Sequence, residues 1–122
     1  MAGNPKFGKR IRELREKKRQ DDPTFSLRQF AVRVGISATF LSKVEVGEFD
    51  PPRAEKIIKM ARLLEIDPDE LLALAGKVDP KLGEIILHQP KAMADFLRTA
   101  RERGLTTEDI ERITKNIKRK RS

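Results

Sequence analysis

Apolar side chains recur every three or four positions along most of this chain, which is the spacing of amphipathic helices. The clearest example covers residues 26–47, where two short apolar stripes flank Gly35. Glycine adopts the left-handed backbone conformation that ends many helices, so we expect Gly35 to close the first helix and Gly47 the second. Two short helices across a tight turn are typical of the helix-turn-helix motif, whose second helix enters the major groove of DNA.

Polar residues at the expected starts of these two helices support the boundaries. Ser26 and Gln29 form a capping-box pattern, in which each side chain accepts a hydrogen bond from the other residue's backbone N–H. Ser37 is expected to cap the second helix. The stripes predict a buried side made of Leu27, Phe30, Ala31 and Val34 in the first helix, and of Phe40, Leu41 and Val44 in the second.

The same spacing predicts helices on both sides of this motif, so the fold class is expected to be all-α. Residues 21–23, with two aspartates and a proline, should form a loop after the first helix. The further helices are expected at residues 5–19, 53–65, 67–76, 79–87, 90–104 and 106–121. The inward-facing residues of those in the first two thirds of the chain are expected to be Phe7, Ile11, Leu14, Ile57, Ile58, Met60, Ala61, Leu64, Leu71, Leu72 and Leu74.

The residues from Gly35 to Gly47 resemble a known motif. Their order, Gly-Ile-Ser-x-x-Phe-Leu-Ser-Lys-Val-Glu-x-Gly, is similar to the Xre-type helix-turn-helix of phage repressors and bacterial regulators. The resemblance continues through Pro51 and Pro52 and covers roughly residues 6–77. It implies a five-helix phage-repressor-like domain over residues 1–77, with double-stranded DNA as its ligand.

The second helix of the motif is the expected recognition helix, because its N-terminal part would point at base edges. Thr39 can bond several bases and Lys43 can reach guanine acceptors, while Ala38 offers only apolar contact. The resemblance implies base contacts from all three residues. Phosphate contacts are expected from helix ends and basic side chains, namely Arg10, Arg28, Ser37, Ser42 and Arg53. The simple alternative is that these positions are only solvated.

Two features depart from the family pattern. Leu27 stands where family members often have glutamine, and Glu48 and Asp50 stand where they often have lysine or arginine. These differences argue against some of the usual phosphate contacts. Glu45 is expected to be structural, paired with an arginine of the first helix such as Arg10.

Residues 78–122 form a second, shorter helical segment. Its apolar stripes exceed what such a segment can bury by itself, so they either pack on the first domain or meet a second copy of the chain. A homodimer would match a symmetric operator, and its expected contacts are Ile85, Ile86, Phe96, Leu97, Ile110, Ile113 and Ile117. The basic run from Lys118 to Arg121 would either touch flanking DNA or complement the end of a helix.

The formal net charge of +8 is unevenly distributed. Residues 1–20 carry a net charge of +6 and residues 81–122 one of +5, whereas residues 21–80 carry −3. Positive ends suit contacts with DNA phosphates. They equally suit solubility and helix C-termini, so charge alone does not separate the two interpretations.

Several classes of function are excluded or disfavoured by composition. The chain has no cysteine, which excludes disulfides, zinc fingers and thiol catalysis. His88, the single histidine, has no set of metal ligands around it, so no metal or other cofactor is expected. The sequence lacks a nucleophile with a base and a glycine-rich phosphate loop, so we expect no enzyme. The lack of a long apolar run or signal peptide predicts a cytoplasmic protein without membrane contact.

We therefore interpret the sequence as a DNA-binding transcriptional regulator, with repression from a palindromic operator as the commonest outcome in the family it resembles. An antitoxin or restriction-modification controller would share this fold and would have a toxin or another protein as a partner. A protein-bridging module is an alternative of another class. The polar residues Thr39 and Lys43 on the recognition helix favour DNA over that alternative.

Overall fold

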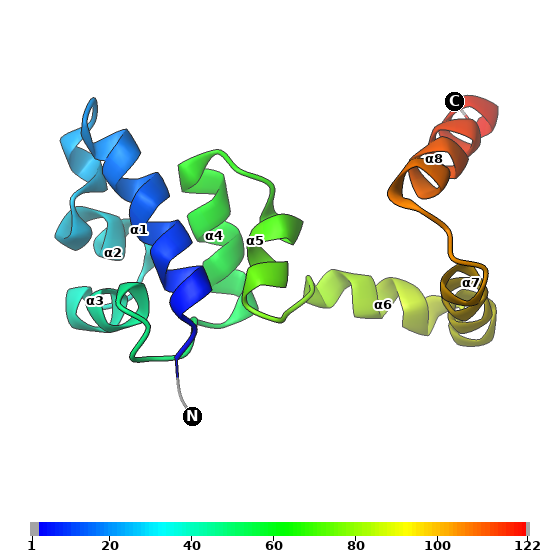
Figure 1. Ribbon diagram of the computed structural model, residues 1–122, viewed down its shortest axis with the longest axis horizontal. Coiled ribbons are helices and arrows are strands. Elements are labelled where there is room, and N and C mark those ends of the chain that lie inside the picture. Colours follow the sequence, from blue (N-terminus) through cyan, green and yellow to red (C-terminus); the bar gives the residue numbers. More distant parts are fainter. Residues whose placement is uncertain (1–2, 122) are drawn as a thin grey trace. The chain divides into compact units, whose positions relative to one another are not determined.

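The computed structural model describes the backbone of residues 3–121 and the side chains of residues 3–120. Within this range the chain is helical and contains no strand, so the all-α prediction is confirmed. The chain divides into two compact units, one up to Pro80 and the other from Lys81 onward, close to the boundary expected after residue 77. The first unit contains α1 (Pro5–Arg19), η1 (Pro23–Phe25), α2 (Leu27–Val34), α3 (Ala38–Glu45), α4 (Ala54–Leu64) and α5 (Pro68–Leu74) (Figure 1).

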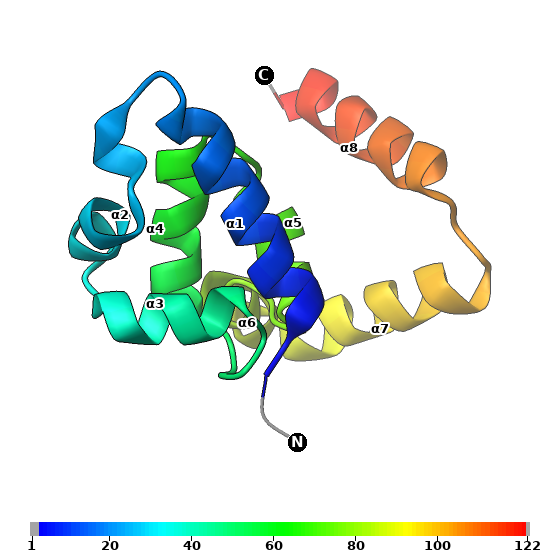
Figure 2. The ribbon, with the colours of Figure 1, turned by 60° about the vertical axis from the view of Figure 1, so that its left-hand side comes forward.

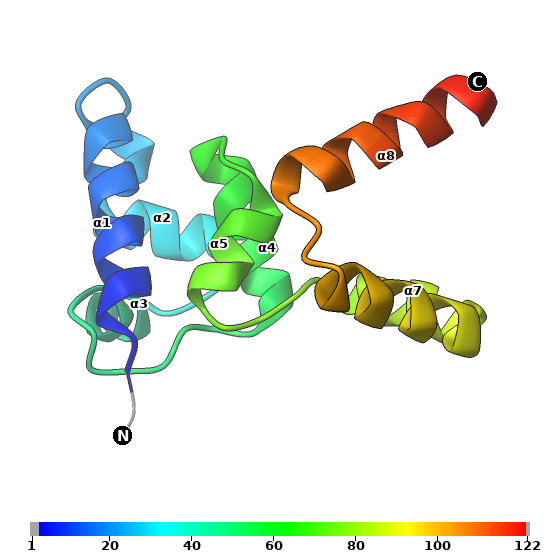
Figure 3. The same ribbon diagram turned by 45° about the vertical axis from the view of Figure 1, so that its right-hand side comes forward.

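The five α-helices of the first unit enclose one apolar core. Figure 2 shows α1 packed beside α4, with α3 lying across the end where α1 begins. Figure 3 shows α4 and α5 side by side. The buried core residues are Phe7, Ile11, Phe25, Phe30, Ala31, Val34, Leu41, Val44, Ile57, Met60, Ala61, Leu64, Leu71 and Leu72.

Most of the predicted core is confirmed, but the prediction that Leu74 faces inward is wrong. Leu74 is 40% exposed. It is the last residue of the short helix α5 and lines a pocket with Arg10 and Leu71 at the edge of the core. Other predicted inward residues lie at the edge of the core and are only partly buried, namely Leu14, Leu27, Phe40 and Ile58.

The loop between α1 and α2 is compact because it contains the short 3₁₀-helix η1. Asp22 caps η1 by accepting hydrogen bonds from the backbone N–H and the hydroxyl of Thr24, and these bonds lower the pKa of its carboxyl group. Phe25 then returns to the core, stacks on Phe30 and lies under the guanidinium of Arg33. The predicted loop is therefore confirmed, with a defined internal structure.

The second unit follows the predicted helix starts and ends. It comprises α6 (Pro80–His88), α7 (Pro90–Glu102) and α8 (Thr107–Arg121). Thr106 and Asp109 form a complete capping box, since each side chain accepts a hydrogen bond from the other residue's backbone N–H. Gly104 has the positive φ of 64° expected of the residue that closes α7.

Between residues 81 and 120 no side chain is fully buried. The seven predicted dimer contacts are all at least partly exposed, and Ile85, Phe96 and Ile117 are each more than half exposed. The basic run predicted at the end of α8 is exposed from Lys118 to Lys120, and the side chain of Arg121 lies outside the described residues.

Candidate nucleic-acid interface

The two central helices begin and end as the sequence predicts. The Ser26 hydroxyl accepts a hydrogen bond from the backbone N–H of Gln29 at 3.2 Å, which starts α2. The reciprocal half of the predicted capping box is wrong. The N–H of Ser26 donates to the carbonyl of Pro23 instead, because η1 precedes the cap and supplies a backbone acceptor.

The turn between α2 and α3 has the geometry of the predicted motif. Gly35 has a φ of 87°, and its N–H donates to the carbonyls of Ala31 and Val32, which closes α2. Two residues later the Ser37 hydroxyl accepts a hydrogen bond from the N–H of Phe40 at 3.0 Å and starts α3. This short connection fixes the direction of α3 relative to α2.

The inner side of α3 is fixed in the core. Leu41 and Val44 have no solvent-exposed surface. The backbone of α1 comes so close to the end of α3 that a Cβ on Gly8 would collide with the Val44 carbonyl oxygen and lie 2.7 Å from that of Glu45. Only glycine permits this approach, which the spacing of apolar residues does not reveal. An isolated glycine inside a helical apolar pattern was the available signal.

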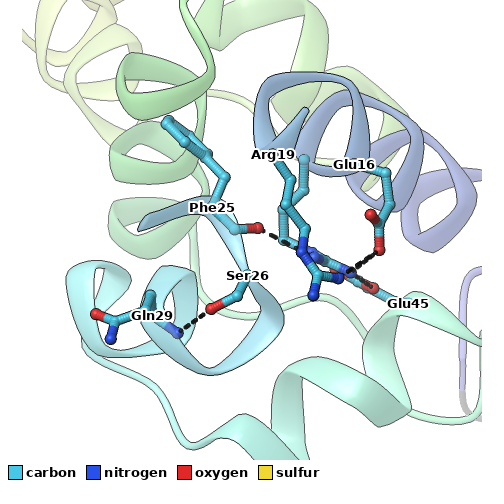
Figure 4. Close-up of polar contacts among 7 residues, drawn as sticks. Glu16, Arg19, Phe25, Ser26, Gln29 and Glu45 are labelled. Atoms are coloured by element: carbon cyan, nitrogen blue, oxygen red, sulfur yellow. Dashed lines mark hydrogen bonds and ion pairs between the residues drawn. The ribbon is translucent and has the colours of Figure 1, made fainter. Parts of the chain in front are cut away.

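A buried ion pair joins the last residue of α3 to α1. Glu45 accepts two hydrogen bonds from the guanidinium of Arg15, Nε to Oε2 at 2.7 Å and Nη2 to Oε1 at 2.9 Å. The same guanidinium donates to the carbonyl of Phe25 at 3.1 Å and reaches Glu16 at 3.3 Å. Figure 4 shows Glu16, Glu45 and the Phe25 carbonyl gathered in one place. The hydrogen bonds to Glu45 are the main reason that the pKa of Arg15 is raised. The guanidinium therefore connects α1, the η1 turn and α3.

The predicted structural role of Glu45 and its pairing with an arginine of the first helix are confirmed, but that arginine is Arg15 and not Arg10. Arg10 lies on the side of α1 that faces α5, where it lines a shallow pocket with Leu71 and Leu74. Arg15 stands four residues after the buried Ile11, on the stripe that faces the core and α3. The helical position of the two arginines thus decides which of them reaches Glu45. The phosphate contact predicted for Arg10 stays a prediction.

The outer side of α3 carries the predicted base contacts. Thr39 is exposed, and Ala38, Ser42 and Lys43 are partly exposed. Lys43 forms an ion pair with Glu48 of the following loop, with 3.0 Å between Nζ and Oε2. The structure therefore brings the four predicted α3 residues to one accessible side, and it adds a carboxylate there.

The remaining predicted phosphate contacts lie at helix starts. Ser37 is exposed at the cap of α3, and Arg28 is exposed in the first turn of α2. Arg53 is the N-cap residue of α4, and its guanidinium lies 3.1 Å from the carboxylate of the exposed Glu55. All three are reachable from solvent, so each could meet a phosphate group.

The described residues offer few other sites. Between residues 3 and 120 no group of three or more histidine, aspartate or glutamate side chains is arranged to hold a metal ion. In the same part of the chain no helix is long and apolar enough to span a membrane.

The sequence of this chain is similar to those of known proteins. A family model described as a helix-turn-helix domain matches residues 6–74. The chain is 29% identical over 125 aligned positions to the uncharacterized HTH-type transcriptional regulator RghRB of Bacillus subtilis, covering 89% of this chain and 86% of that protein. It is 32% identical over 73 positions to the HTH-type transcriptional repressor RghR of the same organism, covering 60% of this chain and 50% of that protein.

One solved structure is also similar. It is the restriction-modification controller protein C.AhdI from Aeromonas hydrophila, with 34% sequence identity and a TM-score of 0.45, covering 55% of this chain and 88% of that one.

Proposed function

This chain belongs to the helix-turn-helix family and is a DNA-binding transcriptional regulator, and we propose that it represses transcription by occupying a palindromic operator as a homodimer. The observation that carries the proposal is the two-sided character of α3. Its apolar side is locked in the core by Leu41 and Val44, while its polar side leaves Thr39 and Lys43 accessible. Repression is supported by the similarity to a relative that is named a repressor.

The proposed contacts follow from the chemistry of each side chain. Thr39 would offer its hydroxyl to a base edge and its methyl group to thymine, and Lys43 would donate to guanine O6 or N7. The hydroxyl of Ser37 already accepts the N–H of Phe40, so its proton remains available for a phosphate oxygen. Arg28 and Arg53 would add charge to the backbone contacts, each steepening the salt dependence by about 0.9 per phosphate neutralised.

A dimer is proposed because one short recognition helix specifies few base pairs. Two copies of α3 on half-sites about 34 Å apart would double the contacts and explain a palindrome. The second unit offers the means of pairing, because its apolar side chains are not buried within the unit. Burial of such faces against an identical copy gives a closed two-fold assembly. The proposal places the protein in the cytoplasm, together with the DNA that it binds.

Selection of bound sequences from a random DNA pool tests the proposed DNA recognition. We expect a palindromic site. Thr39→Ala and Lys43→Ala should each weaken binding to that site by about 1–3 kcal/mol, with little change on random duplex. Equal losses on both kinds of DNA would contradict base recognition by α3.

Light scattering on the full chain tests the dimer. We expect a dimer at tens of micromolar, and we expect Phe96→Glu to shift it to monomer by placing a charge in the proposed contact. Val32→Glu is the matched control, because Val32 is 71% exposed in the first unit and should tolerate the change. A monomeric wild-type chain, or equal effects of the two substitutions, would contradict the proposed dimer surface.

A further inference from the structure

The loop after α3 is folded back onto the recognition helix by a turn at Gly47 and by two kinds of contact. Gly47 takes a positive φ of 81°, which turns the chain sharply after α3. The backbone N–H groups of Glu48 and Phe49 then both donate to the carbonyl of Lys43, at 2.9 and 3.2 Å. The ring of Phe49 packs against that of Phe40, with centroids 6.1 Å apart. The position of Glu48 is therefore defined by the fold.

This geometry sets the Glu48 carboxylate against the ammonium of Lys43, at 3.0 Å. The side chains remain 43% exposed for Lys43 and 57% for Glu48, so the pair lies at the surface that DNA would approach. A free lysine at this place would add a full positive charge to the interface. Paired with Glu48, it adds almost no net charge while it keeps its hydrogen-bond donors.

We propose that Glu48 is a specificity-determining residue that acts through Lys43. This inference rests on the proposed function, since it assumes that α3 recognises operator DNA. An ammonium group has three donors, so one can stay on Glu48 while the others meet guanine O6 and N7. The carboxylate would hold the flexible lysine in the orientation that base recognition requires.

The same carboxylate weakens binding to DNA of any sequence. Non-specific complexes depend on phosphate neutralisation, to which a lysine paired with a carboxylate contributes little. Glu48 also stands close enough to the interface to repel phosphates. On the operator, the contact of the oriented lysine with guanine offsets this repulsion. On random DNA nothing offsets it, so Glu48 widens the ratio between operator and random affinity.

The test compares wild type with Glu48→Gln on two duplexes, the operator selected by the wild-type chain and a random duplex of equal length. Glu48→Gln keeps the size of the side chain and removes its charge. Random-duplex affinity should rise about fivefold, the factor given by one unit-charge interaction at about 4 Å in water. The slope of log affinity against log salt should steepen by up to about 0.9. Operator affinity should rise less than the random-duplex affinity, so the specificity ratio falls.

Two further variants separate this mechanism from a simple change of net charge. In a Lys43→Ala background, Glu48→Gln should increase the affinity for both duplexes equally. The ratio of operator affinity to random-duplex affinity should then stay unchanged. Glu65→Gln is the matched control, because Glu65 also forms an exposed ion pair, with Lys18 at 3.2 Å, and should not alter the ratio.

Each result has a definite meaning. A ratio that falls for Glu48→Gln only when Lys43 is present supports the inference. A ratio that is unchanged, or that falls equally without Lys43, overturns the inference and leaves the proposed function standing. A wild-type chain that prefers no selected sequence overturns both.

Discussion

Breaking the buried ion pair between Arg15 and Glu45 should destabilise the first unit more than removing the pair altogether. The two side chains are each 3% exposed, and they meet through two hydrogen bonds of 2.7 and 2.9 Å. At an effective dielectric constant of 20, two unit charges about 3 Å apart attract by roughly 5 kcal/mol. Burial costs each ion several kcal/mol of lost hydration, so the net contribution of the pair is small.

Removal of one partner leaves the desolvation of the other without compensation. Glu45→Leu and Arg15→Met should therefore each lower the free energy of unfolding by about 3–5 kcal/mol. The double variant removes both charges and replaces them with apolar volume. It should cost only about 1–3 kcal/mol, the cost of leaving the Phe25 carbonyl without the donor it has at 3.1 Å.

Urea unfolding followed by circular dichroism measures these free energies, provided that the slope with denaturant stays constant among the variants. Glu65→Gln serves as the control, since its exposed pair with Lys18 should contribute at most about 1 kcal/mol. The reasoning is refuted if either single substitution costs less than about 1 kcal/mol. It is also refuted if the two single costs simply add in the double variant, because additivity would mean that the charges are not coupled.

Two other expectations follow from burial and from capping. Leu41→Ala should lower the free energy of unfolding by about 2–5 kcal/mol, because Leu41 is buried. Leu74→Ala, at a 40% exposed position, should lower it by less than about 1 kcal/mol. Equal denaturation midpoints for the two variants would contradict the core described above. The pKa of Asp109 is lowered by hydrogen bonds from the N–H and hydroxyl of Thr106, so its stabilisation of α8 is present above about pH 4 and is lost as pH falls through the lowered pKa. An NMR titration of the Asp109 carboxyl should have its midpoint below about 3.9 and should shift upward in Thr106→Ala; a midpoint at or above the ordinary value would contradict the capping box.

Helix boundaries could be predicted from the sequence because their causes are local. Ser37, Asp67 and Thr106 each cap a helix through a backbone group two or three residues away, and Gly35 closes α2 through its own backbone conformation. Such contacts depend on short spacings, which the sequence displays directly. The apolar core of the first unit could be predicted for the same reason, because helical spacing alone separates most inward-facing positions from outward-facing ones.

Contacts between distant elements were harder to predict. The pairing of Glu45 with Arg15 spans thirty residues and depends on which side of α1 faces α3. Several arginines lie on α1, and charge pattern alone does not choose among them. The position of Arg15 on the stripe of Ile11 would have identified it. The close approach at Gly8 is a backbone contact, which no side-chain pattern reports.

In the candidate interface, too, local features could be predicted from the sequence and contacts with other segments could not. Spacing identified the outward residues of α3, because Leu41 and Val44 fix its inner side. It could not show that Lys43 is paired, because that depends on how the loop folds after Gly47. In the sequence, Glu48 is visible only as a departure from the family pattern. In the structure, Glu48 forms an ion pair with Lys43, which is a predicted base contact.

The pairing of Lys43 with Glu48 and the uncovered apolar faces of the second unit support one account of how this protein would select its site. A recognition helix whose lysine is largely neutralised binds random DNA weakly, so a single copy would hold even a correct half-site with modest affinity. Two copies joined through residues 81–120 would add their half-site free energies and lose little by being linked. Because each copy reads its own half-site, the costs of mismatches in the two half-sites would add, and the dimer would specify more base pairs than one copy does. Weak but selective binding by one copy and the pairing of two copies would thus act together in one mechanism. Reversing the charge at Glu48 should give a dimer with higher affinity for DNA and lower specificity for its operator.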